Sequence, residues 1–228
     1  KKVDFDLITT ENAKVRAKHI VFASHFPFVN VPGYYFARMH QGRSYVLALE
    51  NAANFAGTYE GIDADGLSLR NYGELTFVCG GDHRTGENSE GGQYKLLRKK
   101  AEELWPESQE RFNWSAQDCM TPDSVPYIGR FSRSRPDWYV CTGFGKWGMT
   151  SSMVSAILIS RKIAGEKYPF ATVFSPQRDI TPPAAKAIAK NGLKAAKGLG
   201  RSVFDLPEDN IKDLAKGHGG IVEYDRKK

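Results

Sequence analysis

The segment that most restricts the fold is a strand that passes through a glycine-rich turn directly into a helix. Residues 138–142 form a short apolar run typical of a strand, and residues 143–148 contain three glycines. Residues 149–164 then place Met, Ala and Ile side chains along a broad apolar helix face. Because such a unit gathers backbone N–H groups at the positive end of the helix dipole, it predicts a site for electron-rich oxygen atoms.

The same turn matches the G-x-G-x-x-G pattern of dinucleotide-binding proteins at Gly143, Gly145 and Gly148. Glu166 lies close to the distance expected of a ribose-binding acid. Against this interpretation, a bulky tryptophan ring lies inside the turn, and residues 168–170 (YPF) do not continue as a clean buried strand. An NAD(P)-binding reductase therefore stays an alternative, as does a strand-to-helix turn without a ligand.

Composition and charge limit the classes of function. With 228 residues and 41% hydrophobic content the chain can bury a sizeable core, and no apolar run is long enough to cross a bilayer. The formal charge of +6 has no basic block behind it except the lysines of a helix expected at about 183–198. We therefore expect no nucleic-acid and no membrane partner. A non-enzymatic interaction module, in which this helix docks on an acidic partner, stays a second alternative.

The cysteines give a prediction about metal binding and compartment. Cys79, Cys119 and Cys141 stand far apart, without the paired spacing that holds zinc or an iron–sulfur cluster. Reduced core thiols are the simplest interpretation, so no metal site is expected within the chain. Together with an opening that lacks the apolar stretch of a secretory signal, they predict a cytoplasmic protein.

Around the strand–turn–helix unit, sequence patterns predict a mixed α+β or α/β fold with an antiparallel sheet. Residues 3–9 and 15–23 have the character of two hairpin arms, and 43–50, 66–70 and 74–79 are expected to form an antiparallel meander. The other elements expected are a polar glycine-bearing loop at 80–87, a helix at 91–104, a strand at 111–118 and an irregular segment at 119–130.

Two segments carry a resemblance to a known family. Residues 114–130 (WSAQDCMTPDSVPYIGR), followed by residues 139–150 (YVCTGFGKWGMT), resemble the closing segment of the glycine oxidase and D-amino-acid oxidase family. Residues 19–25 (HIVFASH) are similar to the family's strand that returns to the flavin domain, so the likeness covers about residues 1–170. It implies an FAD-dependent oxidoreductase that moves hydride from an amine or amino-acid-type substrate to flavin.

The resemblance implies a carboxy-terminal fragment without the dinucleotide-binding unit that mainly holds FAD. Residues 1–25 would be strands returning to the FAD domain, 26–115 a substrate-binding domain, 116–166 the closing segment of the FAD domain, and 167–228 a tail or linker. The isolated fragment is expected to be inactive and to bind FAD weakly or not at all. Apolar surface on residues 149–164 is expected to make it self-associate.

By the same resemblance, the turn would face the pyrimidine end of the flavin ring, where negative charge grows on reduction. The cofactor-binding residues implied are Ala23, Ser24, Gly143, Gly145, Lys146, Trp147, Gly148, Met149 and Thr150. Weaker candidates for contact with the substrate are Tyr34, Tyr45, Asp118 and Arg130. No catalytic side chain is assigned, because hydride removal from a C–N bond needs orientation and a neutral amine more than a strong acid or base.

One residue departs from the family pattern and bears on the substrate. Asp118 lies where similar oxidases often have an arginine that binds the substrate carboxylate. An anion at this place would repel a carboxylate and favour an amine. A small-molecule amine is therefore the expected substrate, although Arg84 or Arg130 would offer a substitute cation.

A narrower resemblance concerns a subgroup in which a Rieske iron–sulfur domain follows the oxidase. It rests on residues 81–86 (GDHRTG), 114–118 (WSAQD) and 220–224 (GIVEY). A Rieske centre needs two cysteines and two histidines in close pairs, which these residues lack, so a 2Fe-2S cluster would lie only in a downstream domain. The resemblance implies that electrons pass from the flavin to that cluster.

Overall fold

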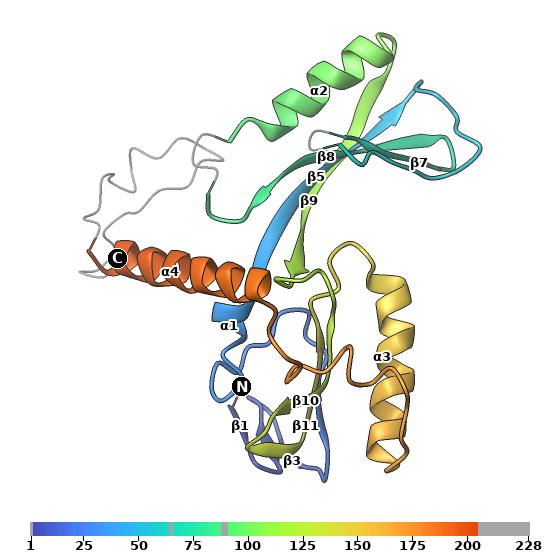
Figure 1. The fold of residues 1–228 in the computed structure, drawn as a ribbon. Helices are drawn as coiled ribbons and strands as arrows, with labels where there is room; N and C mark the ends of the chain where they lie inside the picture. Colours follow the sequence, from blue (N-terminus) through green and yellow to red (C-terminus); the bar gives the residue numbers. More distant parts are fainter. Residues whose placement is uncertain (1, 64–65, 88–90, 205–228) are drawn as a thin grey trace.

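The structure is a computed structural model that describes residues 2–63, 66–87 and 91–204. Its elements form an upper and a lower half in Figure 1, each built around a sheet. The upper sheet is antiparallel throughout, whereas the lower sheet contains a parallel strand pair. Within these described ranges, no helix is long and apolar enough to cross a membrane.

The upper sheet is built on two long strands that run down toward the lower half. β5 and β9 pair antiparallel from His40 opposite Met120 to Glu50 opposite Gln109. β8 pairs with the other edge of β5, and the sheet order is β6-β7-β8-β5-β9. The bounds are β5 (His40–Glu50), β6 (Tyr59–Glu60), β7 (Ser68–Tyr72), β8 (Leu75–Arg84) and β9 (Gln109–Met120).

Helix α2 (Gln93–Leu104) covers one face of the upper sheet (Figure 1). Leu97 and Ala101, one helical turn apart, are buried in a cluster with Leu47, Leu49 and Val78 from β5 and β8. The helix ends at Trp105, immediately before Pro106, whose ring and missing N–H prevent continuation. Burial of this one face therefore fixes the helix on the sheet.

The lower sheet has the order β10-β11-β4, with bounds β4 (Ile20–Phe22), β10 (Tyr127–Ser132) and β11 (Arg135–Thr142). β10 and β11 form an antiparallel hairpin, and β4 adds to β11 in parallel. Helix α3 (Gly148–Ile163) packs on β10 and β11 through Leu158 and Ile159, which are buried with Ile128 and Tyr139. In the described part of the chain, the far edge of β4 pairs with no strand.

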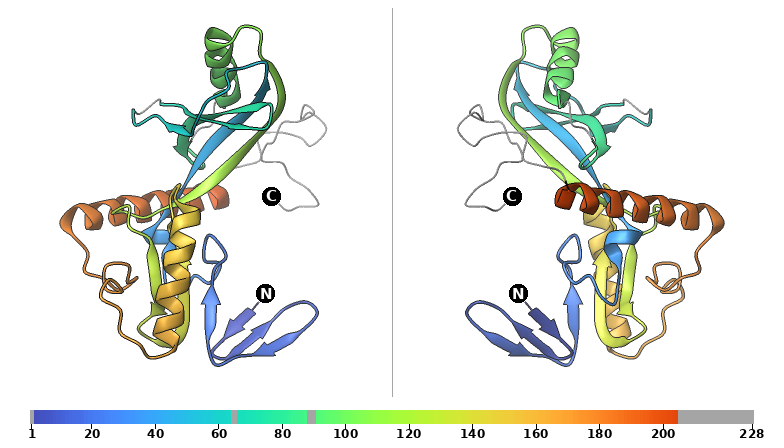
Figure 2. Two further views of the ribbon diagram at one scale, coloured as in Figure 1. Left: turned by 90° about the vertical axis from the view of Figure 1, so that its right-hand side faces the viewer. Right: turned by 90° about the vertical axis from the view of Figure 1, so that its left-hand side faces the viewer.

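Helix α4 (Pro182–Phe204) crosses the junction between the two halves (Figures 1 and 2). It packs against the short helix α1 (Tyr35–Arg38) of the lower half. Its buried Asn191 accepts a hydrogen bond of 2.5 Å from Arg84, at the end of β8 in the upper half. α4 thereby contacts both halves at once.

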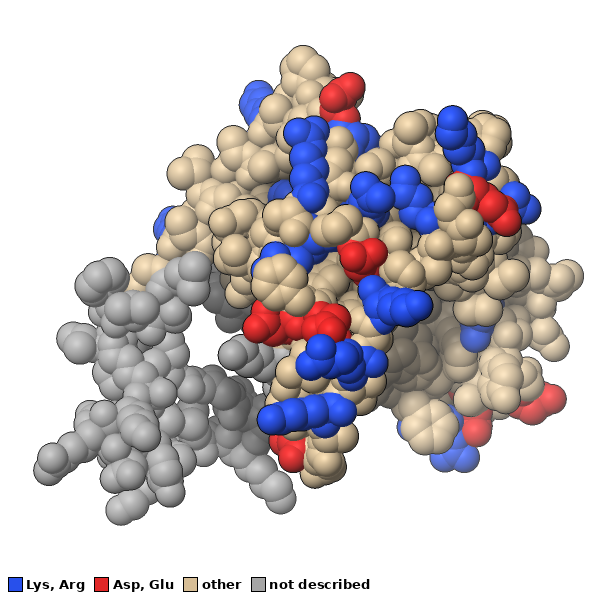
Figure 3. All heavy atoms as spheres, turned by 90° about the horizontal axis from the view of Figure 1, so that it is seen from below, with Lys and Arg blue, Asp and Glu red and all other residues tan. Residues whose placement is uncertain are grey.

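The lysines of α4 are only partly free. Lys194 forms an ion pair with Glu87, which also pairs with Arg84 at 3.2 Å. The face seen from below mixes Lys and Arg with Asp and Glu and wide uncharged areas (Figure 3). Lys186, Lys190 and Lys197 are exposed on α4. An acidic partner that docks on this helix would therefore contact these three lysines.

The mixed fold expected from the sequence is confirmed, but the first elements are shorter than predicted. The segment 3–9 is broken by a turn at Phe5, where φ is +42°, into β1 (Lys2–Asp4) and β2 (Leu7–Thr9). The arm 15–23 also divides: β3 (Lys14–Arg16) completes a small sheet with β2, while β4 joins β11 in the lower half. The hairpin pairing of β2 with β3 is confirmed.

Three predictions in the middle of the chain were wrong in part. The segment 80–87 is a loop only after Arg84, because Gly80 to Arg84 continue β8 through a register shift opposite β5. The segment 119–130 contains the end of β9 and the start of β10, which its prolines and glycine had obscured. The meander is also incomplete, since β5 lies between β8 and β9 and does not pair with β7. The boundary expected at 115/116 lies within β9 and stays a prediction.

The helices at 91–104, 149–164 and 183–198 are confirmed as α2, α3 and α4, within a few residues at each end. The segment that connects α3 to α4 is held by Arg178. Its guanidinium donates to both carboxylate oxygens of Asp123 at 2.7 and 2.8 Å, and to the carbonyl oxygens of Val125 and Pro126. It also lies over the Tyr127 ring, 4.4 Å from the ring centre. The aspartate of the Thr-Pro-Asp sequence is therefore a structural anchor.

We expect Leu97→Ala to lower the free energy of unfolding by about 2–5 kcal/mol, because Leu97 is fully buried and the change leaves a cavity. The matched control is Leu96→Ala on the same helix, where the side chain is 44% exposed and a loss below about 1 kcal/mol is expected. Urea denaturation followed by circular dichroism measures both. Equal losses in the two variants would contradict the assignment of the buried face.

Acidification tests the Asp123 anchor. Burial alone would raise the pKa of this carboxyl, but hydrogen bonds from Arg178 and the Val125 amide hold it below its ordinary value. The contribution to stability is therefore present above pH 3.8 and is lost as the pH falls through the lowered pKa. We expect Asp123→Asn to cost about 1–3 kcal/mol at neutral pH.

The deficit of Asp123→Asn should shrink as both proteins are acidified below the ordinary pKa of aspartate, since the wild-type carboxylate is then protonated. Urea denaturation at a series of pH values measures this difference. Asp137→Asn is the control, because Asp137 lies 3.5 Å from the His19 ring and is mostly exposed. A deficit that is the same at every pH would show that the charge of Asp123 has no role.

Candidate functional site

The turn that follows β11 is shaped by two glycines in the left-handed region. Gly143 has φ +73° and Gly145 has φ +53°, values that residues with a Cβ rarely adopt. A Cβ added to Gly143 would also collide with the methyl group of Thr121, which follows β9. The amide of Gly145 donates to the carbonyl oxygen of Cys119 at 3.0 Å. The turn is thereby seated against the lower end of the upper sheet.

The amide groups of the turn fall into two sets. Those of Gly145 and Trp147 already donate within the protein, to Cys119 and Phe144, and the Ser151 amide begins the helical hydrogen bonds by donating to Trp147. Between Trp147 and Ser151 lie three amides that donate to no acceptor in the part of the chain that the structure describes. They belong to Gly148, Met149 and Thr150. No acidic residue lies in the first turn of α3. The positive end of the helix is therefore open to an electron-rich group.

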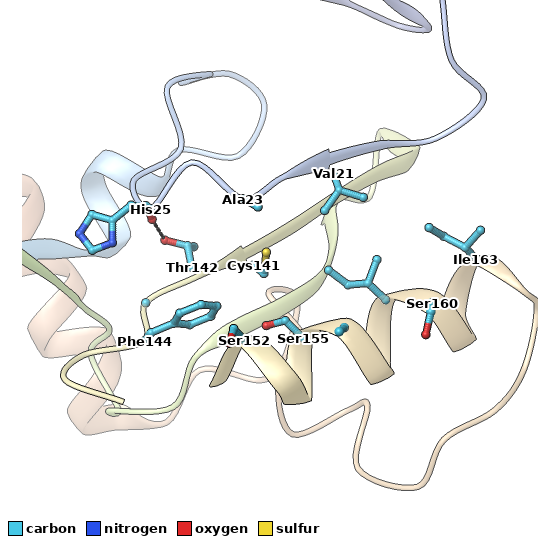
Figure 4. A pocket seen from close by; sticks show the side chains of 13 residues that line it. Val21, Ala23, His25, Cys141, Thr142, Phe144, Ser152, Ser155, Ser160 and Ile163 are labelled. Carbon is cyan, nitrogen blue, oxygen red and sulfur yellow. Dashed lines mark hydrogen bonds between the residues drawn. The ribbon is translucent and has the colours of Figure 1, made fainter. Parts of the chain in front are cut away.

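A cavity of about 580 Å³ lies between β4, the end of β11 and helix α3 (Figure 4). Ala23 and Gly143, both candidates from the sequence, line it, together with Cys141 and the α3 residues Ser155 and Ile159. The lining consists mainly of apolar and small side chains. A cavity of this size and character suits a flat organic group better than a metal ion.

His25 and Thr142 close one end of this cavity (Figure 4). His25 has φ +63°, and its Nε2 lies 2.7 Å from the carbonyl oxygen of Gln117 in β9. The Thr142 hydroxyl donates to the backbone carbonyl of His25, and the Cys119 thiol also points at this oxygen, at 3.5 Å. Burial raises the pKa of the Cys119 thiol to about 11, so it stays protonated. These contacts join β4, β9 and β11 around the cavity.

Lys146 points away from the cavity, toward the upper sheet. Its ammonium lies 2.6 Å from the Ser44 hydroxyl, 3.0 Å from a carboxylate oxygen of Asp82 and 3.3 Å from one of Asp118. Burial alone would lower the pKa of Lys146, but the two carboxylates raise it above its ordinary value. Lys146 is therefore charged, and the carboxylate of Asp118 forms an ion pair with this cation of the turn.

The remaining candidates are not gathered at this place. Ser24 follows Ala23 but donates locally, to the Phe26 carbonyl at 3.1 Å. Tyr45 lies in β5, where its hydroxyl is 2.9 Å from the His83 ring nitrogen. Tyr34 precedes α1 and is half exposed, and the exposed Arg130 lies in β10. None of these four residues lines the cavity.

Sequence reasoning did not select Ser44, Asp82 or His25 for the roles that the structure gives them. Asp82 stood in a segment taken for a loop, and Ser44 in a strand with no distinguishing signal. No local signal marked Asp82, because its place opposite β5 follows from the pairing of distant strands. His25 has no local sequence signal for this role, because its contact with Gln117 joins residues far apart in the chain.

Comparison with known proteins places this architecture among flavoproteins. The family model described as FAD dependent oxidoreductase matches residues 3–162. A protein of Bacillus subtilis (strain 168), named as a Rieske 2Fe-2S iron–sulfur protein, YhfW, is 33% identical over 223 residues, which are 95% of this chain and 44% of that protein. Its name agrees with the resemblance to a Rieske-associated subgroup.

Solved structures share the fold. The glycine oxidase of Geobacillus kaustophilus superposes with a TM-score of 0.64 at 17% identity, over 77% of this chain and 49% of that one. The L-proline dehydrogenase of P. horikoshii gives a TM-score of 0.59 at 14% identity, over 75% and 49%. The chain thus spans less than half the length of these relatives. With the family model covering most of its residues, the chain belongs to the FAD-dependent oxidoreductases of D-amino-acid oxidase type.

Proposed function

We propose that the complete protein oxidises an amine or amino-acid-type substrate with FAD seated at the amino end of α3, and passes the electrons to a Rieske centre. The observation that carries the proposal is the set of three open amides at Gly148, Met149 and Thr150, beside an apolar cavity of about 580 Å³. Family membership supplies the cofactor.

The residues present fit FAD. Open amides at a helix amino end favour a group that gains electron density, and the mostly apolar cavity wall favours a flat ring. When bound, FAD would supply the hydride acceptor and would pass the electrons on to the next carrier. Gly143 and Gly145 keep side chains out of the turn, so that the backbone itself can approach a cofactor.

The contribution of this chain is to position groups and to exclude water. The three amides favour negative charge at one place, and the apolar wall formed by Cys141, Phe144 and Ile159 keeps water away from it. Of the described residues that line the cavity, none is an Asp, Glu, Lys or Arg. This agrees with a reaction that depends on orientation of a neutral amine.

Charge pairing in the structure supports an amine as the substrate. The turn's own cation, Lys146, is bound by Asp82 and Asp118 and so is not offered to a carboxylate. The named activities of the structural neighbours, a glycine oxidase and an L-proline dehydrogenase, support oxidation beside a nitrogen atom. The name of the Bacillus subtilis relative supports a 2Fe-2S acceptor in the complete protein.

The complete polypeptide tests the proposal. Purified protein should show a flavin absorption spectrum that bleaches when a substrate amine is added without oxygen. In the same sample, electron paramagnetic resonance should detect a reduced 2Fe-2S cluster. Primary and secondary amines are compared with the matching amino acids, and faster bleaching by the amines is expected. Absence of flavin, or tight saturable binding of NADH in its place, would contradict the proposal and favour a nicotinamide-binding reductase.

We further propose that the 228-residue chain alone self-associates through α3. Met149, Met153 and Ile157 recur every four residues on one side of this helix and are largely exposed. Light scattering after size exclusion should give a mass that rises with concentration, and Met153→Glu with Ile157→Glu should return it to that of a monomer. Leu104→Glu, which changes an exposed leucine on α2, is the control. A monomer at all concentrations would contradict this proposal.

A further inference from the structure

The side chain of Lys146 connects the turn to the upper sheet at one point. Its three acceptors come from three neighbouring strands: Asp82 from β8, Ser44 from β5 and Asp118 from β9. A lysine ammonium has three N–H groups, so this arrangement engages its full donor capacity. The ammonium therefore has no donor left for a ligand.

The charges of the cluster make the link depend on a cation. Asp82 and Asp118 flank the central strand β5, and Ser44 itself donates to Asp82. With Lys146 removed, the two carboxylates would keep their charge and lose the cation that lies between them. Each ion pair is partly exposed, so a single pair would contribute little, but the three contacts share one side chain.

The turn has few other attachments that fix its orientation. The Gly145 amide binds Cys119, and the Phe144 ring packs in the lower core. The neighbouring side chains of Trp147 and Met149 are 72% and 85% exposed, so packing of these two side chains contributes little to the orientation of the turn. Lys146 is the side chain through which the turn makes ion pairs with the upper sheet.

We propose that Lys146 is a positioning residue: by binding Ser44, Asp82 and Asp118 together, it orients the 143–147 turn and the open amides of Gly148 to Thr150 that follow. It does not bind the substrate. The inference deepens the proposed function, because these amides are the ones assigned to the cofactor. Its first readout needs no cofactor.

Hydrogen exchange in the complete protein without FAD gives this first readout. Lys146→Met should speed exchange of the Gly145 and Trp147 amides, which are hydrogen-bonded in the turn, on the order of tenfold, a change typical of losing charge-assisted hydrogen bonds. Exchange of the Leu97 amide in α2 should not change. Lys146→Arg, which keeps a cation, should restore most of the protection. Lys99→Met removes a lysine of an exposed ion pair with Glu103 and is the matched control.

Cofactor affinity gives the second readout. Titration of the FAD-free protein with FAD, followed by flavin fluorescence, should show affinity about tenfold lower in Lys146→Met, on the scale of a lost charged contact. The triple variant Lys146→Met, Asp82→Asn, Asp118→Asn should recover part of this loss, because it leaves no unpaired carboxylates. If Lys146→Met fails to fold, Asp118→Asn tests the same link with one contact removed, and intermediate exchange rates are expected.

The outcomes separate the two proposals. Unchanged exchange and unchanged FAD affinity in both Lys146→Met and Asp118→Asn would overturn the role of Lys146. The role of Lys146 would also be overturned if Lys146→Arg failed to restore the exchange protection and FAD affinity lost in Lys146→Met, since a cation is what the cluster requires. If wild-type protein binds no FAD, the proposed function fails, while the exchange experiment still decides whether Lys146 positions the turn.

Discussion

The hydrogen bond from the Gly145 amide to the Cys119 carbonyl, 3.0 Å long, is the contact on which the rest of the site depends. Helix α3 packs on the lower sheet, yet its amino end is placed by the end of β9, which belongs to the upper sheet. The close approach leaves no space for a side chain at Gly143, because Thr121 fills it. A residue with a Cβ at 143 would move the turn and separate Lys146 from its partners.

Local sequence patterns predicted the helices and the strand–turn–helix unit because each of these is defined by its own residues. Contacts between distant segments were not predictable in this way. At the break at Phe5, the indole of the distant Trp138 donates a hydrogen bond of 2.5 Å to the Phe5 carbonyl. β10 was missed because Pro122 and Pro126 stand before it and Gly129 lies inside it, although its pairing with β11 supplies the hydrogen bonds of a strand.

The candidate site was predicted unevenly for the same reason. The glycines of the turn have a local sequence signal, whereas Ala23 was named through the resemblance to the oxidase family. As cofactor contacts both stay predictions. The partnership of Lys146 with Asp82 and Asp118 could not be found by sequence, because it joins β8, β9 and the turn. Asp118 is therefore not an isolated anion. It belongs to a cluster of two carboxylates and one ammonium, in which most of its charge is compensated by Lys146.

Among the described residues, no strand pairs with the outer edge of β4, and this bears on what the lower half can bind. A parallel ribbon of two strands offers a row of backbone N–H and C=O groups along its outer margin, and parallel sheets are ordinarily covered on both faces. Ile20 to Phe22 are therefore a template for the addition of one more extended segment. A strand paired with β4 there would cover the open side of the cavity beside Val21 and enclose it.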